Sequence, residues 1–159
     1  MSIALVIRAA ALLTIAAVFG PPQITVRPVT SAAGTTFELD VVHHTEHDDV
    51  TVTGRAEGVQ GGRRVSLPLR ITKARDGLYT VAKQWDAGTP WVLVFAAEQG
   101  HNGALGVAEG AVLLEANGSV RSIEYIRPGF SEKGAKPVRT TTARIDAALK
   151  ALGAAVPTR

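Results

Sequence analysis

The densest group of chemically active side chains in the sequence lies between residues 43 and 49, which read HHTEHDD. Imidazole and carboxylate groups together are suitable ligands for Cu(II) or Zn(II). In an extended segment His43 and His47 share one face, whereas a turn would let all three imidazoles converge. The sequence therefore predicts a candidate divalent-metal site made of His43, His44, His47 and Asp49. The alternative interpretation is a charged, solvated loop between two strands.

The remaining histidine, His101, lies in a second turn-like segment, GHNG at residues 100–103. It can join the first cluster only if the fold brings the two segments together. A single histidine in a loop is more commonly a solvated residue.

Other reactive residues are scarce. The chain contains no cysteine, and its only methionine is Met1. This excludes disulfides, iron–sulfur clusters, thiolate zinc sites and cysteine nucleophiles. The segment around Ser131, GFSEKG, lacks the second glycine and the strand-to-helix setting of a nucleophile elbow. We therefore expect no enzymatic activity, and no cofactor unless the histidine segment binds Cu or Zn.

The charge balance gives no sign of a nucleic-acid partner. The formal net charge is +3, and the arginines are scattered, with Arg63 and Arg64 as the only adjacent pair. Nucleic-acid binders usually gather basic residues on one element.

Residues 1–20 differ from the rest of the chain. Arg8 is their only charged residue, and an apolar run from residue 9 to 19 follows it. This pattern is typical of a signal peptide, and the run is short for a membrane-spanning helix. Pro21 would hinder cleavage after Gly20, so an uncleaved membrane anchor stays open, as does a buried N-terminal helix. We expect an exported protein in the periplasm or anchored facing it, contacting the membrane only through an uncleaved 1–20.

The stretch from residue 23 to 126 has the two-residue hydrophobic period of β-strands. Phe37, Leu39 and Val41 alternate with more polar positions, whereas WVLVFAA at 91–97 is apolar on both faces and predicts a central strand covered on both sides. Asn117-Gly118 predicts a hairpin turn. Seven or eight strands in about 100 residues predict an immunoglobulin-like antiparallel β-sandwich. A small closed barrel is the alternative.

The C-terminal part predicts a linker at 127–139 and an amphipathic helix at 140–153. Threonines 140–142 offer an N-cap, and Gly153 is placed to end the helix. Ile145, Leu149 and Leu152 share one helical face, so we expect the helix to dock on the sandwich.

Several core features are expected from the aromatic residues. Tyr79 follows the Asp76-Gly77 turn and is placed like a tyrosine corner. Trp85 and Trp91 flank a turn, and we expect them in the core rather than on a ligand-binding face.

The order of segments FELDVV, VTVTGRAEG, RRVSLPLRI, DGLYTVAKQW and TPWVLVFAA, behind an apolar leader, resembles small exported bacterial domains of the YtkA-like and FixH-like kind. It is also similar to transthyretin-like and carboxypeptidase-regulatory-like modules. The resemblance covers residues 23–97 and implies a non-catalytic sandwich, in some members near copper or respiratory-complex assembly. It supplies no ligand set, and the methionine ligands of periplasmic copper carriers are missing.

The sequence is compatible with two functions. The first is a non-catalytic exported sandwich that contacts an envelope protein or supports envelope structure through its loops or a sheet edge. The second is a periplasmic Cu or Zn binding or delivery protein that uses the HHTEHDD segment.

Overall fold

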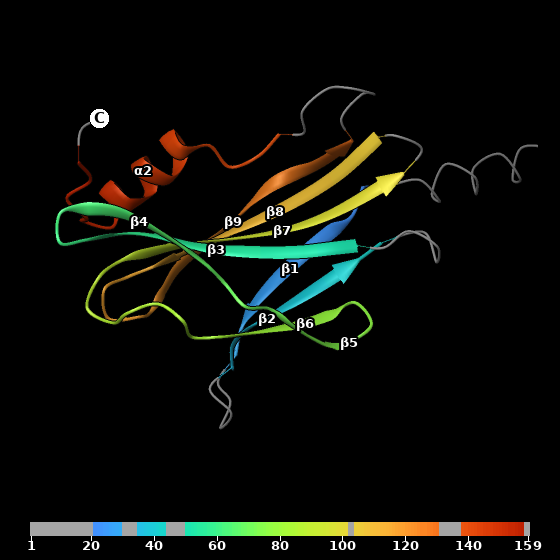
Figure 1. The fold of residues 1–159 in the computed structure, drawn as a ribbon, viewed down its shortest axis with the longest axis horizontal. Helices are drawn as coiled ribbons and strands as arrows, with labels where there is room; N and C mark the ends of the chain where they lie inside the picture. Colours follow the sequence, from blue (N-terminus) through green and yellow to red (C-terminus); the bar gives the residue numbers. More distant parts are fainter. Residues whose placement is uncertain (1–20, 30–34, 44–49, 102–103, 131–137, 158–159) are drawn as a thin grey trace, which may run out of the picture.

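The computed structural model describes residues 21–29, 35–43, 50–101, 104–130 and 138–157. These form two antiparallel sheets and one short helix (Figure 1). The first sheet has the spatial order β1 (Gln23–Pro28), β2 (Thr35–Val42), β6 (Leu78–Ala82), β5 (Thr72–Arg75). The second has the order β4 (Arg63–Pro68), β3 (Val50–Gln60), β7 (Trp91–His101), β8 (Ala104–Leu114), β9 (Val120–Phe130).

The predicted all-β class is thus confirmed, as two packed sheets and not one closed barrel. The described part of the chain contains nine strands, where seven or eight were expected. β9 reaches Phe130, beyond the predicted sandwich boundary at residue 126. The predicted leader, residues 1–20, lies outside the described residues, as does 131–137 of the predicted linker. No helix of the part described is long and apolar enough to cross a membrane.

The main core fills the space between the sheets. The alternating residues Phe37, Leu39 and Val41 of β2 are all buried, as their spacing predicts. Trp85 and Trp91 are buried in the same core, and the indole nitrogen of Trp91 donates to the carbonyl of Asp86 at 2.9 Å. Both tryptophans therefore serve packing, as expected.

β7 is buried on both faces. Trp91, Leu93 and Phe95 face the first sheet, whereas Val92 and Val94 face outward into a second apolar cluster. Helix α2 (Thr142–Ala151) covers that outer face with the buried side chains of Ile145 and Leu149, and Leu152, just after the helix, packs in the same cluster. The prediction of a strand covered on both sides is confirmed, and the cover is the C-terminal helix.

The ends of α2 follow local rules. The Thr141 hydroxyl accepts from the Arg144 amide at 3.2 Å, which caps the N-terminus as the threonine run predicts. The Leu152 amide bonds back to the Ala148 carbonyl at 3.0 Å, and Gly153 adopts a positive φ just after the helix. A ten-residue helix is marginal alone in water, so its stability depends on the docked face.

The hairpin predicted at Asn117-Gly118 is also present. Leu114 of β8 pairs with Val120 of β9 across this turn. Gly118 has φ +86°, which favours glycine, and the Asn117 side chain accepts from the Ser119 amide at 2.9 Å.

The docking of α2 gives a first prediction. Leu149 is 0% exposed, so Leu149→Ala leaves a cavity under the helix and should lower the free energy of unfolding by about 2–5 kcal/mol. Urea unfolding followed by circular dichroism measures this. The matched control is Lys150→Ala, at the exposed neighbouring position, which should change stability by less than about 0.5 kcal/mol. Equal effects of the two substitutions would mean that α2 does not dock in solution.

Candidate functional site

A charged cluster lies on the outer face of the second sheet, beside α2. Glu57 of β3 pairs in register with Ser66 of β4, and Val59 with Arg64, so these side chains are neighbours. Although it is a carboxylate, Glu57 is only 7% exposed. A buried charge requires partners, because its loss of hydration is costly.

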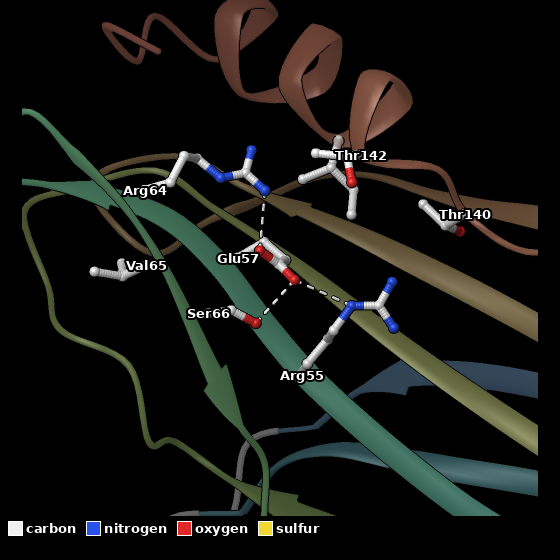
Figure 2. A pocket seen from close by; sticks show the side chains of 8 residues that line it. Arg55, Glu57, Arg64, Val65, Ser66, Thr140 and Thr142 are labelled. Carbon is white, nitrogen blue, oxygen red and sulfur yellow. Dashed lines mark hydrogen bonds and ion pairs between the residues drawn. The ribbon is translucent and has the colours of Figure 1, made fainter. Parts of the chain in front are cut away.

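Three donors surround Glu57 (Figure 2). Its carboxylate accepts from Arg55 Nε at 3.1 Å, from a terminal nitrogen of Arg64 at 3.0 Å and from the Ser66 hydroxyl at 2.9 Å. The other terminal nitrogen of Arg64 bonds to Asp146 of α2. Arg64 therefore connects the buried carboxylate of the sheet to the helix.

A cavity of about 300 Å³ opens between this cluster and the first turn of α2. Its lining includes Arg55, Glu57, Arg64 and Ser66 from the sheet, and Thr140 and Thr142 from the C-terminal segment. Most of these groups are polar or charged, so the cavity is suited to a polar group of a ligand.

A second buried carboxylate lies further along the same face. Glu109 of β8 is 1% exposed and accepts from the Thr140 amide at 2.5 Å. Arg139 donates to Glu98 at 2.9 Å and lies 3.7 Å from Glu109. The hydrogen bond to Glu98 raises the pKa of Arg139 above its usual value. These contacts fix the chain just before α2, so the helix is held at its entry as well as along its apolar face.

The open side of the sandwich between β1 and β9 is bridged by one tyrosine. The Tyr125 hydroxyl accepts from the Val26 amide at 3.0 Å and donates to the Val26 carbonyl at 3.4 Å. Gly110 lies beneath, and a Cβ there would come within 3.0 Å of Val26 and 3.2 Å of the Tyr125 ring. The absence of a side chain at Gly110 therefore allows β1 to approach β8 under this ring.

A further cavity of about 270 Å³ lies along this side, hereafter the seam cavity. It is lined by Gln23, Ile24 and Thr25 of β1, by Ala108 and the buried Glu109 of β8, and by Tyr125 and Ile126 of β9. Tyr79, which we expected to act as a tyrosine corner, is half-buried against the core, and its hydroxyl has no hydrogen bond to the described part of the chain. The tyrosine whose hydroxyl bonds to a distant backbone segment is Tyr125, which contacts Val26.

Of the predicted metal ligands, the structure places only His43, which directly follows β2 and is half-buried. His44, His47 and Asp49 lie outside the described residues. His101 is the last residue of β7, and the pairing of Val50 with Gln99 brings the start of β3 close to it. Within the described ranges no three His, Asp or Glu side chains are grouped to hold a metal ion. The predicted site thus stays a prediction.

Asp76, in the β5–β6 turn, lies within electrostatic reach of His43. Its pKa is held below the usual value, first by the hydrogen bond and charge of Lys73 and to a smaller extent by the charge of His43. The Lys73 ammonium lies 3.1 Å from the Asp76 carboxylate.

Sequence reasoning missed Glu57, Glu109 and Tyr125. Side chains alternate between the two faces of a strand, and a charged residue such as Glu57 normally indicates the face that is exposed to solvent. The one sequence feature that pointed to a buried Glu57 was the segment 91–97, which is apolar on both faces. Such a strand requires a cover on the outer face of the sheet, and this cover also buries some polar residues of the neighbouring strands. The sequence has no corresponding signal for Tyr125.

Comparison with known proteins adds no relative. No protein-family model, curated protein or solved structure matches this chain.

The Glu57 cluster gives the second prediction. Glu57→Gln removes the charge shared by Arg55 and Arg64, and should lower the free energy of unfolding by about 3 kcal/mol, as for other broken buried ion pairs. Glu38→Gln is the control, since Glu38 is only half-buried and lies 3.7 Å from the exposed Arg27, and should cost less than about 1 kcal/mol. Urea unfolding of both variants measures the difference. If Glu57→Gln lowered the free energy of unfolding no more than the control does, Glu57 would not be the buried partner that Arg55 and Arg64 share.

Proposed function

We propose that this chain is a non-catalytic β-sandwich domain, exported to the periplasm or cell envelope, that binds another protein through a sheet edge. The strand order supports an immunoglobulin-like module. β1-β2-β6-β5 corresponds to the A-B-E-D sheet of such domains, and β4-β3-β7-β8 to the opposing sheet, with β9 as an added edge strand. The apolar, singly charged segment at 1–20 supports export.

The open edge of β1 is the observation that carries the proposal. Both backbone groups of Val26 point away from β2, toward Tyr125. Backbone direction alternates along a strand, so Ile24 presents its amide and carbonyl on the same outer edge. The Val29 amide bonds inward to Thr36, which agrees with this alternation.

The seam cavity adjoins that edge. Ile24 lines it together with Ala108 and Ile126, so its walls are in part apolar. An extended segment of a partner can hydrogen-bond to the outward backbone groups of Ile24 and place one apolar side chain in the cavity. This is recognition by strand addition, in which backbone bonds give affinity and a side-chain pocket gives specificity.

Site-specific photo-crosslinking tests this proposal. The full chain, with its own residues 1–20, carries a photoreactive side chain at Gln23, beside the seam cavity, in bacterial cells. The control position is Arg75, which is also exposed but lies on β5, at the opposite edge of the same sheet. We expect one discrete protein adduct, in the envelope fraction, from position 23 only. No adduct at 23, or the same adduct from position 75, would overturn the seam as the binding edge.

Divalent-metal binding by His43, His44, His47 and Asp49 is the second candidate function. The arrangement of the strands favours it. His101 is the last residue of β7, and the end of β2 and the starts of β3 and β8 lie at the same end of the sandwich (Figure 1). The HHTEHDD segment connects β2 to β3, so it leaves the sandwich at this end.

Calorimetric titration with Cu(II) and Zn(II) tests the metal hypothesis. We expect one equivalent to bind, with affinity falling below about pH 6 as the imidazoles protonate. The triple variant with alanine at His43, His44 and His47 should lose this binding, and His101→Ala reports separately on the fourth histidine. A binding curve unchanged in the triple variant would refute the hypothesis.

A further inference from the structure

We propose that the cavity between the first turn of α2 and strands β3–β4 binds an oxyanion, a carboxylate or a phosphate, with Arg55 as its main ligand. This site is separate from the seam cavity, and the proposal does not depend on the sheet-edge function. It follows from the hydrogen-bonding capacity that the lining residues leave unused.

The carboxylate in this cavity is already bonded to donors of the protein. The Glu57 carboxylate accepts three hydrogen bonds, from Arg55, Arg64 and Ser66. Both terminal nitrogens of Arg64 are engaged, one with Glu57 and the other with Asp146. Glu57 and Arg64 are therefore already held by partners within the protein.

Arg55, in contrast, has donors to spare. It bonds to Glu57 through Nε alone, and its two terminal amino groups have no partner among the residues that the structure describes. Figure 2 shows these two nitrogens directed away from Glu57. The side chain is 35% exposed, so a ligand can reach it. A guanidinium with two free amino groups is the geometry that binds carboxylate and phosphate oxygens.

The C-terminal segment supplies further donors across the cavity. The Thr142 side chain lies on the cavity side of the first turn of α2, facing β3 (Figure 2). That turn carries no acidic side chain, and the Glu109 carboxylate that bonds to the Thr140 amide just before it is itself faced by Arg139, so the partial positive charge of the helix N-terminus remains available. Thr140, which also lines the cavity, is 9% exposed, and its hydroxyl has no hydrogen-bond partner in the described part of the chain.

The charges agree with an anionic ligand. Two guanidinium groups, Arg55 and Arg64, balance two carboxylates, Glu57 and Asp146, so the side chains of the cluster are neutral together. The helix N-terminus then adds a partial positive charge of about half a unit. What remains unused is a set of donors, and a volume of about 300 Å³ holds a phosphate or carboxylate group.

Nuclear magnetic resonance titration of the ¹⁵N-labelled chain tests the site, with sodium phosphate and sodium acetate as probes at constant ionic strength. We expect saturable shifts at the amides of Thr142 and Ala143 and at Arg55 Nε. Arg55→Gln should weaken binding about tenfold or more. Arg121→Gln is the matched control, because Arg121 bonds to the other end of the helix, at the Ala151 carbonyl, and should leave binding unchanged.

A second variant separates loss of the site from loss of the fold. Thr142→Asp places a carboxylate in the first turn, where it favours the helix and repels an anion. It should abolish binding while the chain remains at least as stable as the natural one in urea. Retained binding in this variant would overturn the proposal.

The two probes also distinguish sources of the ligand. Saturation by phosphate alone identifies a site for a free or esterified phosphate, whereas saturation by acetate as well identifies a site for carboxylates, such as acidic side chains. Shifts that stay linear with concentration, and are equal in the Arg55 and Arg121 variants, would show ionic screening only and refute the site.

Discussion

The burial of β7 and β8 on both faces is the constraint on which the rest of the structure depends. Val92 and Val94 of β7 alternate with core residues, as Ala111 and Leu113 do in β8. One sheet can cover only one of these faces, and an apolar face left in water would be unfavourable. Helix α2 is therefore as necessary to the second sheet as the first sheet is. The contacts that hold the helix determine where charged groups gather on the molecule.

Those charged groups are unusual for the outside of a sandwich. Glu57 and Glu109 are buried carboxylates on the outer face of the second sheet, and each contacts the C-terminal segment or a residue that holds it. Replacing buried ion pairs with apolar residues is often neutral for stability. The buried carboxylates are therefore better explained by the orientation that they give to α2 than by a gain in free energy of folding. Their contacts join α2 and the residues just before it to defined positions on the sheet.

The sequence predicted the fold well wherever periodicity decided the outcome. The alternation of Phe37, Leu39 and Val41, the Asn117-Gly118 turn and the threonine cap before α2 all depend on local rules. The end of β9 was predicted too early, because Pro128 suggests a break although an edge strand tolerates proline. Glu57 and Tyr125 could not be found, since their roles depend on partners distant in the chain. Tyr125 and Val26, for example, are 99 residues apart.

The position of α2 after the strands that it covers has a consequence for how the chain folds. Strands β7 and β8 are complete at Leu114, whereas the helix that covers them begins at Thr142. A ribosome or an export channel delivers the chain N-terminus first, so the outer face of these strands emerges before its cover exists. During that interval the nascent chain carries an adhesive apolar surface of the kind that chaperones recognise. A chain cut short before residue 142 would lack this cover and would keep the outer face of β7 and β8 exposed.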